Sequence, residues 1–149
     1  MKRAILLLLF LWGTTTACPA DNLYRTVTVT DAKYNGTTIS AANPMPVAAG
    51  ATVYTDSLRV QAAGLFGGQI GIDAFTTPID VSWYTQISFD GEHWSAAASN
   101  GSLEGTYTST GVQDAVRLDV TIPAPLMRFK IVNNGSVDVN ITRIRVTTW

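Results

Sequence analysis

The chain has 149 residues, of which 46% are hydrophobic and only 14% charged, a length that suits one domain with a sizeable core. Once Lys2 and Arg3 leave with the N-terminal segment described below, eight basic residues remain against eleven acidic ones, a net charge of −3. The remaining basic residues form no cluster in the sequence. This composition argues against binding to nucleic acid or anionic lipid.

The N-terminus has the pattern of an export signal. Lys2 and Arg3 precede an apolar run at 4–12, and small residues follow that run. The run is too short to span a bilayer as a stable helix, so we expect no transmembrane segment in the mature protein. We predict a signal peptide over 1–20, one domain over 21–149, and a secreted, periplasmic or cell-surface location.

Cys18 is the only cysteine, so an intradomain disulfide is excluded. Two interpretations of this boundary stay open. Cleavage after Ala20 would remove Cys18 with the signal peptide. Alternatively, the signal ends at Ala17 and Cys18 carries the lipid of a bacterial lipoprotein, although Thr15 stands where such signals usually have Leu. The second interpretation would anchor the domain to a membrane.

The rest of the chain has the composition and periodicity of strands. Thr, Ser, Val, Gly and Ala are abundant, and no stretch shows a convincing helical period. Eight or nine short strands separated by turn signals predict a single antiparallel, jelly-roll-like β-sandwich of the all-β class. In chain order, the expected strands are 24–30, 37–40, 57–62, 68–74, 79–89, 115–122, 126–132 and 137–147.

The expected strand 79–89 alternates most clearly between apolar and polar residues. Its polar face carries Asp80, Tyr84 and Gln86, and an exposed Tyr beside amide and carboxylate groups can stack on a sugar ring and bond its hydroxyls. These three are the candidate ligand-binding residues. The alternation assigns Ile79, Val81, Trp83, Ile87 and Phe89 to the inner face, and Asp80, Ser82, Tyr84, Gln86 and Ser88 to the outer face.

The last two expected strands suggest a hairpin. If the apolar residues of both face inward, the connecting loop must have an odd length, and Asn133, Asn134 and Gly135 provide a three-residue turn with Gly135 left-handed. This register would place Lys130 opposite Asp138. The inward set is Met127, Phe129 and Ile131 on one strand, and Val137, Val139 and Ile141 on the other. The parity then switches to Ile144 and Val146, which predicts a β-bulge near Thr142 or Arg143.

Four N-x-S/T acceptor sequences begin at Asn35, Asn100, Asn134 and Asn140. Three of them are Asn-Gly, the dipeptide that tight turns select for its backbone freedom. We therefore interpret them mainly as turn signals in a bacterial or phage-encoded protein, rather than as glycosylation sites.

The segment SFDGEHW, 88–94, gathers Asp90, Glu92 and the single histidine, His93. Catalysis by two carboxylates needs an opposing pair in a cleft, whereas these two would lie on one exposed turn. A zinc site needs further His or Cys ligands, and residues 21–149 contain none. Because Asp-Gly is a hairpin signal, we expect a structural turn and no enzyme, with Asp90 bonded to its own turn and Trp94 packed beneath it. The turn consists of Ser88, Asp90, Gly91 and Trp94.

The order of SFDGEHW at 88–94, the strand at 115–122, Pro125 and Arg128 resembles the second half of discoidin-type, galactose-binding-like β-sandwiches. Similar layouts occur in phage virion and surface-assembly proteins. The resemblance covers roughly 79–146, and the cysteine pair that often joins the family's termini is absent. It implies a jelly-roll fold, binding of glycans, lipids or proteins through loops at one end, often a structural Ca²⁺, and rarely catalysis. The residues themselves indicate no cofactor.

Two classes of function remain. The first is a secreted recognition module, which binds a glycan or a surface protein through Asp80, Tyr84 and Gln86. The second is a structural subunit of an extracellular or virion assembly that self-associates through strand contacts. It rests on the segment YRTVTVTD, 24–31, which has high β-propensity and could pair with a neighbour's sheet edge.

Overall fold

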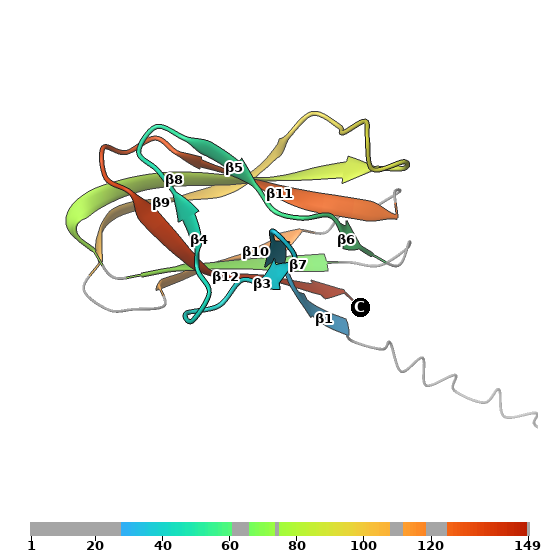
Figure 1. The fold of residues 1–149 in the computed structure, drawn as a ribbon, viewed down its shortest axis with the longest axis horizontal. Coiled ribbons are helices and arrows are strands. Elements are labelled where there is room, and N and C mark those ends of the chain that lie inside the picture. Colours follow the sequence, from blue (N-terminus) through green and yellow to red (C-terminus); the bar gives the residue numbers. More distant parts are fainter. Residues whose placement is uncertain (1–27, 61–65, 74, 108–111, 119–124, 149) are drawn as a thin grey trace, which may run out of the picture.

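Two five-stranded antiparallel sheets pack face to face in the computed structural model, which describes residues 28–60, 66–73, 75–107, 112–118 and 125–148 (Figure 1). The predicted all-β sandwich is confirmed. The export signal and Cys18 lie outside the described residues. Within the described ranges, no helix is long and apolar enough to cross a membrane.

The first sheet has the order β1-β12-β7-β10, with β4 also paired to β12, and it forms the lower layer in Figure 1. Its register brings segments far apart in sequence together, since β1 and β12 are close to opposite ends of the chain. The strands are β1 (Thr28–Asp31), β4 (Met45–Val47), β7 (Phe66–Ile72), β10 (Val112–Leu118) and β12 (Val139–Thr148).

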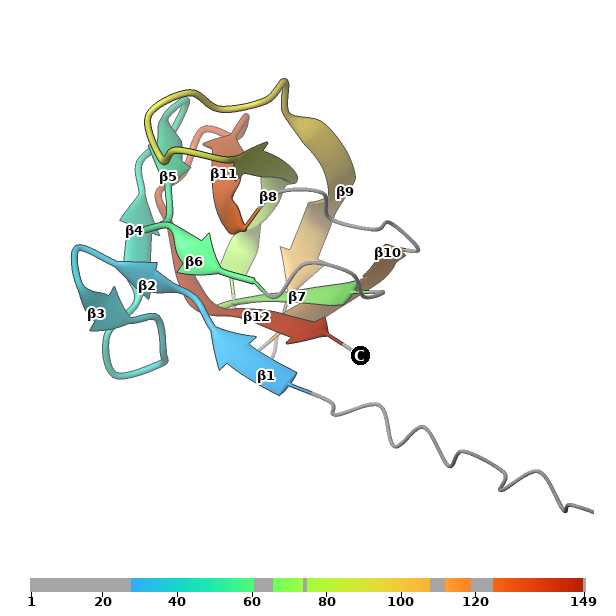
Figure 2. The ribbon, with the colours of Figure 1, turned by 90° about the vertical axis from the view of Figure 1, so that its right-hand side faces the viewer.

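The second sheet has the order β5-β11-β8-β9, with β6 also paired to β11. A separate hairpin of β2 and β3 flanks the two layers, as the end-on view in Figure 2 shows. The strands of the second sheet are β5 (Thr52–Tyr54), β6 (Leu58–Arg59), β8 (Phe75–Ser88), β9 (Ala98–Tyr107) and β11 (Leu126–Asn133), and those of the hairpin are β2 (Lys33–Tyr34) and β3 (Thr37–Thr38).

The core lies between the sheets and follows the predicted alternation of apolar residues. Trp83 of β8 and Phe129 of β11 are fully buried, with ring centroids 5.8 Å apart. The bulge expected near Thr142 or Arg143 is confirmed, because the pairing of β12 with β7 shifts between Ile141 and Arg143. The shift keeps the apolar side chains on both sides of the bulge in the core. The fully buried set includes Val81, Met127, Ile131, Val139, Ile141, Ile144 and Val146.

The predicted final hairpin is wrong, although its inward and outward residues are correct. β11 and β12 belong to different sheets, so the segment between them crosses from one layer to the other. Lys130 pairs with Tyr54 and Tyr84 rather than with Asp138. Gly135 does not adopt a left-handed conformation. In a sandwich, two consecutive strands can both face the core without pairing, because the core lies between their sheets.

Asn133 makes this crossing possible. Its side chain is fully buried, and Nδ2 donates to the carbonyls of Val47 (3.1 Å), Ala48 (3.2 Å) and Val137 (2.7 Å), while Oδ1 accepts from the Gly135 amide (3.0 Å). Val47 is the last residue of β4, while Ala48 and Val137 lie outside the strands. The buried side-chain amide of Asn133 therefore bonds backbone groups that the crossing would otherwise leave without a hydrogen-bond partner.

The strand β9 was not predicted, because Ser, Asn and Gly obscure its alternation. Asn100 and Gly101 lie inside it rather than in a tight turn, at a register shift opposite Trp83 and Tyr84. The Asn100 side chain is buried and donates through Nδ2 to Thr85 Oγ1 at 2.8 Å. A buried amide with a partner can replace an apolar residue on an inner face without leaving a polar group unbonded.

The Asn35–Gly36 dipeptide does form the tight turn that its sequence predicts. Both residues have positive φ, 50° and 78°, in the connection between β2 and β3. Their amides donate to the two carboxylate oxygens of Asp56, at 3.1 and 2.7 Å. The Asn-Gly signal therefore marks a left-handed turn at one of its three positions.

β1 is an edge strand of its own sandwich. Its four residues are the last four of the predicted segment 24–31, and residues 24–27 lie outside the described residues. Arg145 of β12 holds Asp31 with two bonds, from Nε to Oδ1 (2.7 Å) and from Nη2 to Oδ2 (3.1 Å). The bond from Arg145 lowers the pKa of Asp31.

Candidate functional site

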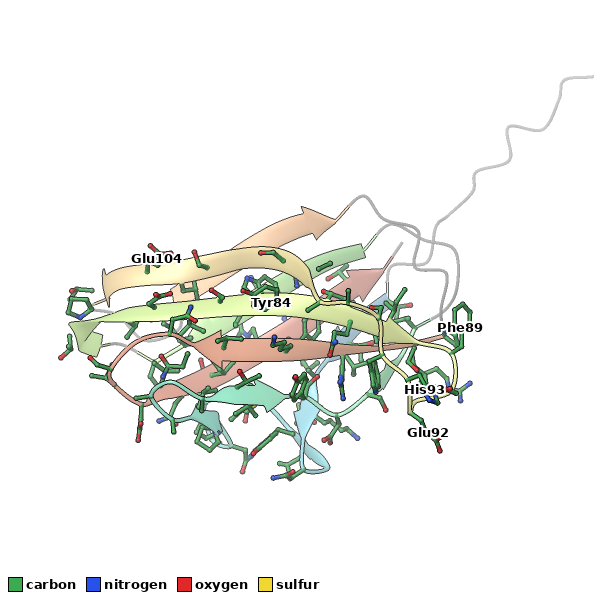
Figure 3. The ribbon with its side chains drawn as sticks, turned by 90° about the horizontal axis from the view of Figure 1, so that it is seen from above. Tyr84, Phe89, Glu92, His93 and Glu104 are labelled. Atoms are coloured by element: carbon green, nitrogen blue, oxygen red, sulfur yellow. The ribbon has the colours of Figure 1, made fainter. Side chains whose placement is uncertain are left out.

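The outer face of the β5-β11-β8-β9 sheet carries all three predicted ligand-binding residues. Asp80, Tyr84 and Gln86 lie at alternate positions of β8 and are half-buried, while Val81 and Trp83 between them face the core. Figure 3 looks onto this face and shows Tyr84 near its centre. The strand period of two thus separates the core residues from the candidate site.

The pairing of three strands places a cation between two tyrosines. Lys130 of β11 is opposite Tyr84 of β8 on one side and Tyr54 of β5 on the other. Its Nζ lies 5.3 Å from the centroid of the Tyr84 ring. A cation at this distance from a ring is attracted by the ring's quadrupole, so Lys130 helps to fix the orientation of Tyr84.

Arg128 forms a second and tighter arrangement on the same face. Its Cζ lies 4.3 Å from the centroid of the Tyr54 ring and 4.2 Å from the centroid of the Trp94 ring. Both rings therefore contact the guanidinium. Nε of Arg128 donates to Gln86 Oε1 at 3.0 Å, and Gln86 Nε2 donates to the Ser95 carbonyl at 2.8 Å. The stack therefore joins β5, β8, β11 and the segment after β8.

The turn at 88–94 is organised by one carboxylate. Oδ1 of Asp90 accepts from the Ser88 hydroxyl (3.0 Å) and from the amides of Glu92 and His93 (2.9 Å each), and Oδ2 lies 2.7 Å from His93 Nδ1. Bonds from the His93 amide, then from the His93 ring and the Glu92 amide, hold the pKa of Asp90 well below its usual range. The Ser88 hydroxyl in turn accepts from the Gly91 amide at 2.8 Å.

Three details of this turn differ from the sequence prediction. Trp94 is half-buried instead of buried, and its ring contacts Arg128 while its Nε1 donates to the Gly91 carbonyl of the loop at 3.2 Å. Phe89 is 72% exposed instead of inward, and Ser88 is buried instead of outward. The alternation ends because β8 ends at Ser88, and the connection to β9 runs over 89–97 rather than through a two-residue turn.

Asp80, a predicted ligand-binding residue, contacts Asn134, a residue of the predicted turn 133–135. Asn134 Nδ2 donates to Asp80 Oδ1 and to Ser82 Oγ, at 3.0 Å each. The Asn134 amide also donates to the Asp80 carbonyl at 2.7 Å. Asp80 thus anchors the crossing after β11 to β8, and it lies opposite Glu104 of β9 at the acidic end of the face.

This geometry suits binding better than bond cleavage. The carboxylate of Asp90 is occupied by its own turn, and Glu92 projects from the end of the loop in Figure 3. Among the described residues, no group of three or more His, Cys, Asp or Glu side chains could hold a metal ion. What the face offers is a set of aromatic rings held in place by cations, with amide and hydroxyl groups between them.

The sequence did not identify Tyr54, Trp94 or Lys130 as members of this face, and named Arg128 only as part of a resemblance. The strand alternation around Arg128 and Lys130 places both outward. Their contacts with Tyr54 and Trp94 depend on the register of β5 with β11 and on the path of the segment after β8. Neither feature can be derived from the local sequence.

By sequence, no protein family and no curated protein matches the chain. Solved structures do match its fold. One is a chain of infectious bursal disease virus, Gt strain, with a TM-score of 0.59 and 13% identity over 83% of this chain and 32% of that chain. Another is the Clostridium thermocellum xylanase 10B chain with CBM22-1 and GH10 modules, complexed with xylohexaose, with a TM-score of 0.51 and 9% identity over 83% of this chain and 24% of that chain.

The fold is a galactose-binding-like β-sandwich. The CBM36-1 domain of a xylanase from the hindgut metagenome of Trinervitermes trinervoides also matches, with a TM-score of 0.49 and 14% identity over 81% of this chain and 96% of that domain. This chain spans about a third of the viral chain and about a quarter of the xylanase chain. The galactose-binding-like sandwich supports many functions, so the function has to be argued from the site.

Proposed function

We propose that this protein is a secreted, non-catalytic recognition module that binds carbohydrate on the outer face of the β5-β11-β8-β9 sheet. The observation that carries the proposal is the set of three rings on this face, Tyr54, Tyr84 and Trp94, each contacted by Arg128 or Lys130. The xylanase chain complexed with xylohexaose supports it at the level of fold.

The rings would bind by contact with the apolar faces of sugar rings. An aromatic side chain presents a rigid flat surface that loses little entropy on binding, and the cation contacts restrict Tyr84 and Trp94 further. Sugar hydroxyls would bond half-buried amide and hydroxyl groups of the same face, of which Gln86 and Ser82 are examples. Asp80 and Gln86 also position other residues, Asn134 and Arg128 respectively.

The test is binding of the purified protein to a panel of soluble neutral and acidic polysaccharides, measured by isothermal titration calorimetry. Tyr84→Ala should weaken binding by about three- to tenfold, the value of one aromatic contact. Phe89→Ala removes an exposed aromatic side chain outside the face and should leave binding unchanged. A Tyr54→Ala, Tyr84→Ala double variant that binds as the wild type does would contradict the proposal, as would a panel without any ligand.

A second function, subunit of an extracellular or virion assembly, is supported by the fold match to the chain of infectious bursal disease virus. β1 is an edge strand, with Val29 54% exposed, and could accept a neighbouring strand. Sedimentation velocity over a hundredfold range of concentration would test it. Oligomers that disappear when 21–31 are deleted would favour assembly, whereas a monomer at every concentration would contradict it.

A further inference from the structure

Arg128 has the surroundings of an anion-binding group rather than of a simple structural contact. Among the described residues its guanidinium donates only through Nε, to Gln86, while Tyr54 and Trp94 contact it through their rings. The guanidinium is planar, and its two Nη groups form a fork that matches the two oxygens of a carboxylate. The rings of Tyr54 and Trp94 and the hydrogen bond to Gln86 thus fix the plane of the guanidinium and leave its two Nη groups for a ligand.

The charges on the sheet are segregated. Lys130 is the next outward residue of β11, and Arg59 of β6 lies outward opposite Leu126, so three cations share one side of the face. The acidic pair Asp80 and Glu104 lies toward the other end; Asp80 is four residues before Tyr84 on β8, about 13 Å away. Figure 3 shows Glu104 and the loop at opposite ends of the face.

The acidic residues of the loop 89–97, which carries Trp94, do not compete for Arg128. Both carboxylate oxygens of Asp90 are bonded within its own turn and to His93. Glu92 is exposed and projects from the loop end. A positively charged area thus exists on a domain whose predicted mature charge is −3. General attraction between the whole protein and a polyanion would not explain anion binding here.

We propose that the ligand of this face is an acidic glycan, and that Arg128 and Lys130 bind its carboxylate groups while the neighbouring rings contact its sugar rings. The inference rests on the proposed function, because it specifies the class of carbohydrate that the same face binds. Two flanking rings exclude water from the guanidinium and strengthen its attraction for an anion. The geometry favours a carboxylate, whose two oxygens lie in one plane with the fork.

The experiment compares oligogalacturonate with the same oligomer after methyl esterification, which removes the charge and keeps the sugar rings. The wild-type protein should bind the acid at least about tenfold more tightly than the ester, as expected for a charge-assisted bidentate contact. The preference should decrease with added salt. A sulfated neutral oligosaccharide forms the third arm, and tighter binding of this ligand than of the carboxylate would overturn the assignment.

Variants separate a ligand contact from a structural one. Arg128→Lys keeps the charge but lacks the fork, so its affinity for the acid should fall about tenfold more than its affinity for the ester, which the altered contact with the two rings can also lower. Lys130→Gln should show a smaller loss of the same selectivity. Arg143→Gln removes one positive charge from the other sheet and should leave both affinities unchanged. Thermal midpoints identify any variant that fails to fold, and Lys130→Gln still tests the inference if Arg128→Lys does so.

The outcomes distinguish this inference from the proposed function. Equal affinities for acid and ester, or an Arg128→Lys variant with the wild-type preference, would overturn the acidic ligand and leave carbohydrate recognition standing. Binding of neither oligomer, nor of any neutral polysaccharide in the panel, would overturn carbohydrate recognition itself.

Discussion

The indole ring of Trp83 in one sheet lies directly against Gly68 in the other. A Cβ placed on Gly68 would be 2.9 Å from Cη2 and 3.2 Å from Cζ3 of the ring, closer than carbon atoms approach without displacement. Trp83 is fully buried and packs on Phe129, so its ring has little room to move. The absence of a side chain at Gly68 therefore permits the two sheets to pack around one large residue.

Gly68→Ala should lower the free energy of unfolding by about 1–3 kcal/mol, because the added methyl group overpacks the core. Chemical denaturation of the variant measures this effect. In a Trp83→Phe background the smaller ring leaves space, and the Ala substitution should cost less there than in the wild type. Equal costs in the two backgrounds would show that the contact with Trp83 does not limit this position.

Asn133→Ala should destabilise the protein by about 2–4 kcal/mol. The substitution leaves the buried carbonyl of Val47 and the half-buried carbonyl of Val137 without the amide that bonds them, and each unsatisfied buried group costs about 1–3 kcal/mol. Asn134→Ala is the matched control, because its amide bonds Asp80 and Ser82 in an exposed position and should cost about 1 kcal/mol or less. A denaturation midpoint for Asn134→Ala at or below that of Asn133→Ala would contradict this account.

Alternation within single strands could be predicted from the sequence, because it depends only on the period of two. The inward residues of β11 and β12, and even the bulge between Ile141 and Arg143, followed from it. Which sheet each strand joins could not be predicted. An arch between two sheets and a hairpin within one sheet both turn the apolar residues inward, so the pattern at Met127 and Val139 fits either topology.

The candidate face was predicted only where a single strand defines it. Tyr84 and Gln86 share β8, and local alternation places both outward. The stack around Arg128 joins residues 54, 94 and 128, whose proximity depends on strand order and on the path of the segment 89–97. Turn residues were similarly ambiguous, because Asn35 begins a left-handed turn whereas Asn100 lies inside β9.

Trp94→Ala should lower the free energy of unfolding by about 1–2 kcal/mol, less than expected for a core tryptophan, because the ring is half-buried and contributes mainly its contact with Arg128. Trp83→Ala is the matched control, and loss of this fully buried ring should cost about 3–5 kcal/mol. Both values come from urea denaturation. Equal losses would indicate that Trp94 is a core residue after all.

The last prediction concerns the pH dependence of the turn. Asp90 has a pKa below that of an unfolded Asp, about 3.9, because the folded turn bonds its charged form. A depressed pKa means that the carboxylate stabilises the fold above the unfolded pKa and that this contribution is lost as pH falls through the folded pKa. Asp90→Asn should therefore have a lower thermal midpoint than the wild type at pH 7, and the difference should narrow as pH decreases below about 4.

Glu92→Gln, two residues away and exposed, should stay close to the wild type over the same range. Thermal melts of the three proteins between pH 7 and pH 2.5 measure both differences. A constant difference in thermal midpoint between wild type and Asp90→Asn would mean that the charge on Asp90 does not stabilise the turn. Protonation of the wild-type carboxyl would then cause no loss of stability.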